Sequence, residues 1–557
     1  MQGRRSERLF MMVIGLVAAG LILVPMLNLL LGSLTVQEGR EIISRFSLQN
    51  YVEVFTNTRL VTALRNTLIT SAGATLGAVV VGVSLAWATA RTDMPGTRAF
   101  ESLNLIPFFM SPFVGAFAWR MLAAPNVGVL NRVGDALPIP LPELNIYSLG
   151  GIIWVLILFY TPYVYLFTIG SFRGMDPSLE DAARMCGSSI WQTARRITLP
   201  VIAPAIMSGM LITFVTSAGI FDVPIALGAI SGIDTMSTEI FRVLQFPADF
   251  GLAATISSAL FVLTITALML QRRIIASRSY ATVTGRGYRP RKIALGKWRY
   301  ALFGLNVLYI TAAAVLPIAI LFVVSIQRVW TANFVPELLT LDTYRYILFD
   351  YPLTRRALTN SIVLSLVGAT VAVAAVVFLS YSIYRTRMPG RGALDAIITF
   401  PITVPGIVLA MGILVTYIRT PLYATLGIVG LAYVTRFLPF AHRTVSSVLL
   451  SIDPELDECS RVSGARLWET VRRILLPLLR PGVAAAWLML FVIFIRELGS
   501  SILLYSSGTE VMSVAILLLT RFGDIEEAAA LSIVQTLFLL SAVVLYRKFV
   551  GLERIGM

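Results

Sequence analysis

The sequence predicts an all-α polytopic membrane protein with about twelve transmembrane helices, arranged as two parallel six-helix repeats. Of the 557 residues, 57% are hydrophobic types and 13% are charged, and the mean hydropathy is +0.81. These values differ strongly from those of soluble globular proteins. Apolar runs of about 20 residues, the length needed to cross a bilayer, recur along the chain. The two halves of the chain also resemble each other in sequence.

The apolar runs predict the position of each span. The first run is longer than the hydrophobic region of a signal peptide and no small-residue cleavage site follows it, so we expect it to stay as an anchor. We expect the twelve spans at residues 9–33, 65–90, 101–124, 149–172, 201–227, 252–270, 301–326, 359–384, 394–417, 424–447, 481–504 and 528–546.

The formal net charge of +15 comes from basic residues in short segments between the spans. In a soluble protein this charge would suggest a nucleic-acid partner, but in a membrane protein it indicates topology. Residues 274–299, between the sixth and seventh spans, include seven Arg and Lys residues and no acidic residue. The positive-inside rule therefore predicts that this linker and both termini lie in the cytoplasm.

The chain contains an internal repeat. Residues 65–96 resemble residues 359–390 at an offset of 294, and residues 176–204 resemble residues 453–481 at an offset of 277, with 13 of 29 positions identical. Because each half has an even number of spans, the repeats are parallel rather than inverted. We therefore divide the chain into a first repeat (1–273), a basic cytoplasmic linker (274–299) and a second repeat (300–557). Residues in equivalent positions include Asn66 and Asn360, Arg91 and Arg385, Pro107 and Pro401, and Pro112 and Pro405.

The repeated polar segment predicts a short helix, a glycine bend and a second helix. Asp176-Pro177 and Asp453-Pro454 are typical of a helix start, because Asp accepts from the free N–H groups and Pro suits the first helical position. Gly187 and Gly464 suit the left-handed residue that ends a helix. Ser189 and Gln192 predict a capping box for the second helix, whereas the later copy has Arg466 and Glu469. A single such segment could also be an amphipathic helix lying on the bilayer.

The two polar segments resemble the EAA loop of ABC importer permeases. The first copy matches at Glu180, Ala183, Gly187, Ile197, Leu199 and Pro200; the second matches at Gly464, Ile474, Leu476 and Pro477 and departs at Asp457 and Ser460. The resemblance implies that coupling loop 1 (residues 176–200) and coupling loop 2 (residues 453–477) each sit in a cleft of a cytoplasmic ATPase. The implied ATPase-coupling residues are Glu180, Asp181, Ala183, Gly187, Asp457, Glu458 and Gly464.

The chain itself shows no sign of enzymatic chemistry. Its three lysines stand outside the G-x-x-x-x-G-K-[ST] pattern that cradles phosphates, so ATP and Mg²⁺ are expected in a separate ATPase subunit and no cofactor is expected here. One histidine, His442, cannot build a His-based metal site, and we expect it to be packed or interfacial. The two cysteines, Cys186 and Cys459, fall on the expected cytoplasmic side, and we expect them to be small packed residues.

Charged residues inside spans are costly, so they indicate either a transport pathway or a structural pair. Asp222, Arg496 and Glu497 fall in the fifth and eleventh predicted spans, and both interpretations remain open for them. Asn66 and Asn360, at equivalent span starts, are expected to be helix caps or interhelical hydrogen-bond donors.

Taken over nearly the whole chain, the sequence resembles a fused, two-repeat permease of a type I ABC importer, most closely the ferric-iron group. The resemblance implies a multi-pass protein of the bacterial inner membrane whose partners are two copies of a cytoplasmic ATPase subunit, a periplasmic or extracellular binding protein and the bilayer, without nucleic acid. Ferric iron is the expected substrate, and thiamine, phosphonate or polyamine are the alternatives. The rival class is an ion-coupled secondary transporter that would use the charges inside its spans.

Overall fold

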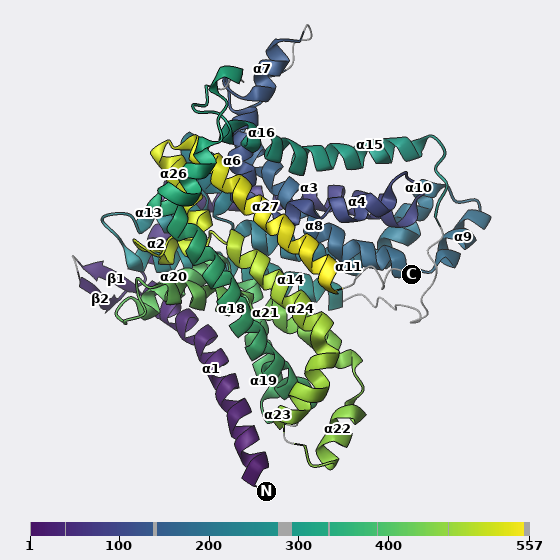
Figure 1. The fold of residues 1–557 in the computed structure, drawn as a ribbon, viewed down its shortest axis with the longest axis vertical. Coiled ribbons are helices and arrows are strands. Elements are labelled where there is room, and N and C mark those ends of the chain that lie inside the picture. The colour runs from purple at the N-terminus through teal and green to yellow at the C-terminus, as the bar shows by residue number, and fades with distance from the viewer. Residues whose placement is uncertain are drawn as a thin grey trace. The chain divides into compact units, whose positions relative to one another are not determined.

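The computed structural model describes residues 2–38, 41–137, 142–276, 292–331, 335–386, 388–465 and 467–550. These residues are mostly helical (Figure 1). One antiparallel hairpin interrupts the helices, formed by β1 (Thr35–Glu38) and β2 (Glu41–Phe46), with Thr35 opposite Phe46. Fifteen of the predicted linker residues, 277–291, lie outside the described residues.

The first half of the chain runs from α1 to α14. Its helices are α1 (Gln2–Ser33), α2 (Gln49–Thr56), α3 (Thr58–Arg91), α4 (Thr97–Leu103), α5 (Ile106–Phe109), α6 (Pro112–Ala123), α7 (Val129–Asp135), α8 (Leu149–Gly174), α9 (Pro177–Met185), α10 (Ile190–Thr193), η1 (Ala194–Thr198), α11 (Leu199–Ala218), η2 (Pro224–Gly228), α12 (Ala229–Ser231), α13 (Met236–Val243) and α14 (Phe250–Ala276).

The second half repeats this order from α15 to α27. Its helices are α15 (Trp298–Ile310), η3 (Thr311–Val315), α16 (Leu316–Ser325), η4 (Pro336–Leu338), α17 (Asp342–Arg345), η5 (Tyr346–Asp350), α18 (Pro352–Arg385), α19 (Arg391–Thr399), η6 (Phe400–Thr403), α20 (Gly406–Tyr417), α21 (Leu426–Ser451), α22 (Pro454–Val462), α23 (Leu467–Thr470), η7 (Val471–Leu475), α24 (Leu476–Arg496), α25 (Ser501–Leu504), α26 (Met512–Phe522) and α27 (Ile525–Val550).

Among the described residues, nine helices are long and apolar enough to cross a membrane, or eleven if each of two bent pairs counts as one span. The predicted count of twelve is therefore not confirmed. The predicted span at 424–447 corresponds to α21, which has 26 residues but does not meet the apolar criterion. Its sequence carries Arg436, His442 and Arg443, which lower its hydropathy.

Two predicted spans, 101–124 and 394–417, are bent. The helices before and after Ser111 meet at 94°, and those before and after Pro405 meet at 111°. Proline accounts for the positions of the bends, because it lacks an N–H and forces the preceding residue toward an extended conformation. Pro112 begins α6, and Val404, just before Pro405, is extended.

The predicted spans 201–227 and 481–504 are also not continuous. Helix α11 ends at Ala218 and α24 ends at Arg496, and each is followed by a short non-helical break before the next helical turn. Each break contains a glycine, Gly219 or Gly499. A carboxylate lies at each break: Asp222 begins the helical turn that follows the first break, and Glu497 is the first residue of the second break. The apolar run continued through each break, so hydropathy alone did not reveal it.

Contacts between residues divide the chain into two compact units. The boundaries of these units differ from the predicted repeat boundaries at 273 and 300. Unit 1 comprises Met1–Val54, Ile240–Phe261 and Thr340–Met557, and unit 2 comprises Phe55–Glu239 and Val262–Leu339. Unit 1 thus joins the first helix of the chain to most of the second repeat. Unit 2 joins α15 and α16, which begin the second repeat, to most of the first.

The helices that begin each repeat pack in the unit that holds most of the other repeat, and close helix packing explains this arrangement. In unit 1, Gly412 of α20 lies so near α1 that an added Cβ would stand 2.7 Å from the Pro25 carbonyl oxygen. The Asn28 amide also donates to the Thr416 hydroxyl, 3.1 Å away. In unit 2, the Tyr309 hydroxyl of α15 donates to the Leu158 carbonyl at 3.0 Å. Small residues and buried hydrogen bonds are the usual means of helix association in membranes.

Candidate coupling loops and buried charges

Both coupling loops have the backbone that the sequence predicts. Asp176 accepts from the Ser178 N–H at 2.9 Å, and Asp453 accepts from the Glu455 N–H at 3.0 Å, so each Asp caps its helix. The bends at Gly187 and Gly464 have φ of +83° and +87°. These left-handed conformations favour glycine and end the helix.

The capping box predicted for coupling loop 1 is confirmed. The Ser189 N–H donates to Gln192 Oε1 at 3.0 Å, and the Gln192 N–H donates to Ser189 Oγ at 3.2 Å. In coupling loop 2, Arg466 lies outside the described residues and Glu469 is exposed. The second helix of each loop continues into the next long helix through a π turn, η1 or η7.

The leading carboxylate of coupling loop 1 is internal rather than exposed. Glu180 is 6% exposed and forms a buried ion pair with Arg91 at the end of α3. Its other oxygen accepts from the Thr198 hydroxyl at 2.7 Å. Glu180 therefore fastens α9 to α3 and to the start of α11, and it positions the loop instead of presenting a charge to a partner.

The leading carboxylate of coupling loop 2 is buried to the same extent but has a different hydrogen-bond partner. Asp457 is 6% exposed and accepts from the Tyr381 hydroxyl at 2.9 and 3.2 Å. Arg385, the equivalent of Arg91, instead donates to the carbonyls of Leu449 (2.7 Å) and Ile452 at the end of α21. Asp is one methylene shorter than Glu, and a tyrosine supplies the donor that its carboxylate needs.

The other predicted coupling residues lie nearer the surface. Asp181 and Ala183 are half-buried, whereas Glu458 and both bend glycines are exposed. Cys186 and Cys459 are free and exposed, so the expectation that they are packed was wrong. Each cysteine lies at the polar outer surface of its loop, which hydropathy could not distinguish from a packed position.

The most exposed large apolar side chains of the two loops occupy equivalent positions. Leu179, Met185 and Trp191 are 44%, 89% and 75% exposed in coupling loop 1. Leu456, Val462 and Trp468, each 277 residues later, are 47%, 88% and 59% exposed in coupling loop 2. We call these six residues the apolar triplets. They are not among the residues predicted from the sequence, although apolar residues that recur at one offset within polar helices could have indicated them. Exposed apolar groups that recur in this way are typical of a contact surface.

The end of the linker adds a strap beside the anchor of coupling loop 1. The Ile293 N–H donates to the Arg91 carbonyl at 2.7 Å, and the Asp93 N–H donates to the Ile293 carbonyl at 3.1 Å. The Leu295 N–H donates to the Asp93 carboxylate at 3.1 Å. Ile293 also lines a small cavity with Glu180 and Thr198. The linker is thus physically joined to the residue that holds Glu180.

The predicted pathway charges lie at the two helix breaks: Asp222 follows the first break, Arg496 ends α24 and Glu497 begins the second break. Asp222 is 9% exposed and belongs to unit 2, whereas Arg496 and Glu497 belong to unit 1. Glu497 forms an ion pair with Arg436 of α21 and accepts from the Ser500 N–H at 2.9 Å. For Glu497 this favours the structural interpretation, because the pair fixes the break against α21. Arg436 was missed since 61 residues separate it from Glu497.

Residues 66–279 and 386–552 match the family described as the binding-protein-dependent transport system inner membrane component. The chain belongs to this family. It is the permease of an ABC importer, an integral membrane transport protein rather than an enzyme, and the double match confirms the two predicted repeats. Membership also sets aside the ion-coupled alternative.

The permease resembles proteins named for several cargoes. A Haemophilus influenzae permease named for ferric transport, FbpB 1, is 26% identical over 473 residues, covering 84% of this chain and 74% of its own. The ferric transport system permease FbpB of Actinobacillus pleuropneumoniae is 24% identical over 532 residues, covering 92% and 74%. A Salmonella typhimurium permease named for 2-aminoethylphosphonate transport, PhnV, is 27% identical over 221 residues, covering 39% and 82%.

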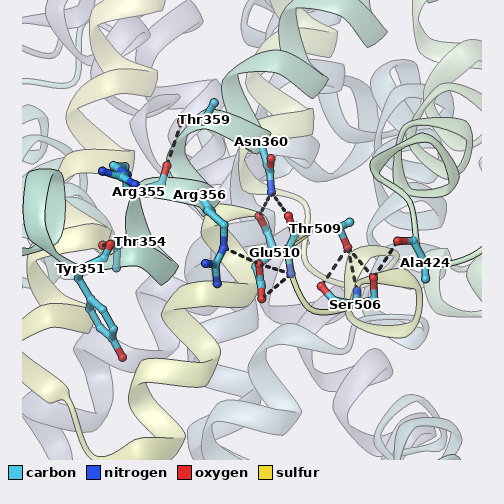
Figure 2. A network of polar contacts seen from close by, with 11 residues as sticks. Tyr351, Thr354, Arg355, Arg356, Thr359, Asn360, Ala424, Ser506, Thr509 and Glu510 are labelled. Atoms are coloured by element: carbon cyan, nitrogen blue, oxygen red, sulfur yellow. Dashed lines mark hydrogen bonds and ion pairs between the residues drawn. The ribbon is translucent and has the colours of Figure 1, made fainter.

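Each repeat has a polar clamp in the N-terminal part of its long helix, α3 or α18, whose other end adjoins the coupling loop. Asn66 donates to the Asp234 carbonyl at 2.9 Å. Asn360 donates to the carbonyls of Gly508 (3.1 Å) and Glu510 (2.9 Å), as Figure 2 shows. These acceptors lie in the loops before α13 and α26, so among the described residues each Asn donates from a helix to a loop and, contrary to the prediction, neither caps a helix nor bonds to a second helix. The clamp holds the segment after each break against α3 or α18.

The permease buries its single histidine in a polar network near coupling loop 2. His442 Nδ1 lies 2.9 Å from Ser380 Oγ, and His442 Nε2 lies 2.8 Å from Asp395 Oδ1. Tyr384 donates to the same carboxylate at 3.1 Å. Ser380 is fully buried, so this Ser-His-Asp series joins α18, α19 and α21 and gives no substrate access for catalysis.

Proposed function

We propose that this permease forms the translocation pathway of an ATP-driven importer, in which two copies of a separate cytoplasmic ATPase subunit act on coupling loops 1 and 2. Its cargo is ferric iron, delivered by a periplasmic or extracellular binding protein. The observation that carries the proposal is the pair of apolar triplets, presented at equivalent positions on two loops that are anchored to the long helices.

The anchors supply the mechanical link that such an importer needs. A loop that is pushed by its partner moves the transmembrane helices when rigid contacts connect them. Glu180 ties α9 to α3 and α11, and Asp457 ties α22 to α18. In this proposal the triplets contact the ATPase, the buried carboxylates transmit the movement, and ATP and Mg²⁺ stay in the ATPase.

The orientation of the permease in the membrane follows from the position of its basic residues beside coupling loop 1. The basic residues at 292–299 lie beside coupling loop 1 through the strap, and basic segments favour the cytoplasmic side. Both coupling loops and both termini are therefore proposed to be cytoplasmic. The polar clamps then face the binding protein. Asp222 and Arg496 stay candidates for the pathway.

Relatives support ferric iron as cargo, since two permeases named for ferric transport are similar over 84% and 92% of this chain. A second candidate is a phosphonate, because the permease named for 2-aminoethylphosphonate transport is similar over 39%. Uptake of radiolabelled Fe³⁺ and of 2-aminoethylphosphonate into vesicles carrying the assembled transporter distinguishes the two cargoes.

The docking proposal is tested by co-purifying the permease with its ATPase. Trp191→Ala combined with Trp468→Ala is compared with Trp298→Ala, an exposed tryptophan outside the loops; Trp191 and Trp298 are 75% and 76% exposed. We expect the double variant to lose the ATPase and the control to retain it. Equal retention by both variants would refute docking through the triplets.

A further inference from the structure

A cavity of about 420 Å³ lies in unit 1, at the ends of α21 and α24 that are opposite coupling loop 2. Helix α21 begins at Leu426 and runs to that loop, and α24 leaves the loop and ends at Arg496. The segments just before α21 and just after α24 therefore lie on the opposite side, and both line the cavity. The lining residues used below are Phe241, Gln245, Tyr423, Tyr505, Ser507 and Arg521.

Arg521 gives the cavity a positive charge, and its guanidinium forms no hydrogen bond or ion pair with the residues that the structure describes. It stands in the last turn of α26, with its guanidinium carbon 5.2 Å from the centre of the Phe241 ring. Stacking occupies the face of a guanidinium and leaves its in-plane N–H groups able to grip two oxygens of one ligand. Among the described lining residues, none is Asp or Glu.

The buried carboxylate that acts on the lining residue Tyr505 is Glu510, and it is already engaged. Glu510 is 5% exposed and both its oxygens accept from the Gly508 N–H at 3.1 Å. Its Oε2 also lies 3.7 Å from Arg356 Nε, an ion pair. Figure 2 marks this pair. Glu510 is therefore neutralised from the side of α18 and leaves Arg521 as the charge that faces the cavity.

The other polar lining groups are neutral and can donate. Burial raises the pKa of Tyr505, against the opposing effect of Arg521, so its hydroxyl stays protonated at neutral pH. Tyr423 and Ser507 are exposed hydroxyls, and the Gln245 amide lies beside them. One cation surrounded by hydroxyl and amide donors is an arrangement suited to an oxyanion.

We propose that this cavity is a binding site for a small ligand that carries a phosphate, phosphonate or carboxylate group, gripped by Arg521 and hydrogen-bonded by Tyr505. The site lies on the side that receives cargo if the proposed function holds. The oxyanion can then come from a phosphonate cargo or from the acidic ligand of a ferric chelate. The volume suits molecules of that size, since small-molecule sites span about 300–1,000 Å³.

The test uses the purified full-length permease in lipid nanodiscs and isothermal titration with inorganic phosphate, 2-aminoethylphosphonate, citrate and ferric citrate. Arg521→Gln is expected to weaken binding by about 10-fold to 100-fold, the range for a lost charged hydrogen bond. Tyr505→Phe is expected to weaken binding by about 3-fold to 10-fold. Arg355→Gln, an exposed arginine outside the cavity, is the matched control and should bind as the wild type does.

The outcomes separate the possible sources and failures. Preference for 2-aminoethylphosphonate indicates a phosphonate cargo, and preference for ferric citrate over citrate indicates a chelate. Absence of saturable binding by all four probes, or equal binding by Arg521→Gln, overturns the proposal. ATPase association is measured on the same samples: if it persists without anion binding, the cavity proposal alone fails, and if the wild type binds no ATPase, the proposed function fails.

Discussion

Coupling loops 1 and 2 share a backbone and an exposed surface, yet each is fastened differently. In loop 1, Glu180 meets Arg91 and Thr198; in loop 2, Asp457 meets Tyr381, and Arg385 turns to backbone carbonyls. The capping Asp, the bend glycine and the apolar triplet recur in both. Both loops therefore present the same kind of surface to a partner, whereas the residues that satisfy the buried carboxylate differ between them.

The strap sharpens this contrast. Ile293 pairs with the backbone at Arg91 and Asp93, and in the described part of the chain no isolated strand pairing of this kind is found beside Arg385. The buried carboxylate of loop 1 therefore has an ion pair with a linker strap beside it, whereas that of loop 2 has a neutral donor, Tyr381. The two loops should accordingly respond differently to matched substitutions.

The largest expected effect is at the ion pair. Arg91→Met leaves the Glu180 carboxylate buried without its cation, a change that typically destabilises by about 3–5 kcal/mol. Hydrogen exchange followed by mass spectrometry should show faster exchange in 177–185 and little change in 454–462. Adding Glu180→Gln should restore much of the protection, because no lone charge then remains. Unchanged exchange in Arg91→Met would show that the pair does not hold the loop.

The second largest effect on stability is expected at the hydrogen bond between the Tyr381 hydroxyl and Asp457 in loop 2. Tyr381→Phe removes the hydroxyl that donates to the Asp457 carboxylate, and a hydrogen bond to a charged group contributes about 1.5–3 kcal/mol. Exchange should rise in 454–462 and stay constant in 177–185, the reverse of the first prediction. Tyr346→Phe, at an exposed tyrosine away from both loops, serves as the control. A response confined to loop 1 would contradict the assignment of the anchors.

The bend glycines should respond equally in the two loops. An added Cβ at Gly187 or Gly464 meets no neighbour within 4 Å, so the cost comes from the positive φ alone, about 1–2 kcal/mol. Gly304→Ala, in helix α15 with open space around it, is the control and should not destabilise. Thermal unfolding of the three alanine variants measures this. If the losses of stability in Gly187→Ala and Gly464→Ala differ by more than their mean loss, the two loops are not equivalent.

The smallest expected effect is at the strap. Ile293→Pro removes one hydrogen bond to the Arg91 carbonyl, worth about 0.5–1.5 kcal/mol. Ala294→Pro is the matched control, because Ala294 is exposed and its N–H takes no part in the strap. Exchange should rise in 177–185 for Ile293→Pro alone. If both prolines act alike, the strap has no specific role in holding loop 1.

Local chemistry made much of the fold and of the loops predictable. Apolar runs placed most spans, Asp176 and Gly187 marked the ends of a helix, and Ser189 with Gln192 marked the next start. Each of these signals lies within a few residues of its effect. Proline indicated the bends at Ser111 and Pro405, but hydropathy averaged over each apolar run does not show them.

Long-range contacts account for what the sequence did not reveal. Glu180 looked like a surface charge because its partner Arg91 is 89 residues away. Arg436 is likewise separated from its partner Glu497, by 61 residues. The packing of α1 against the second repeat depends on shape at Gly412, which a repeat search cannot detect. The apolar triplets were visible in principle, since Trp191 and Trp468 recur at one offset.

The most direct test of the central claim uses the two native cysteines, which are the only ones in the chain. Cys186 and Cys459 are free and exposed, one in each coupling loop. The rate at which a maleimide labels each is measured by mass spectrometry on the wild-type permease in nanodiscs, with and without its ATPase. If the loops are the docking surfaces, the ATPase slows labelling of both cysteines. Undiminished labelling of both in a complex that has demonstrably formed would contradict the account.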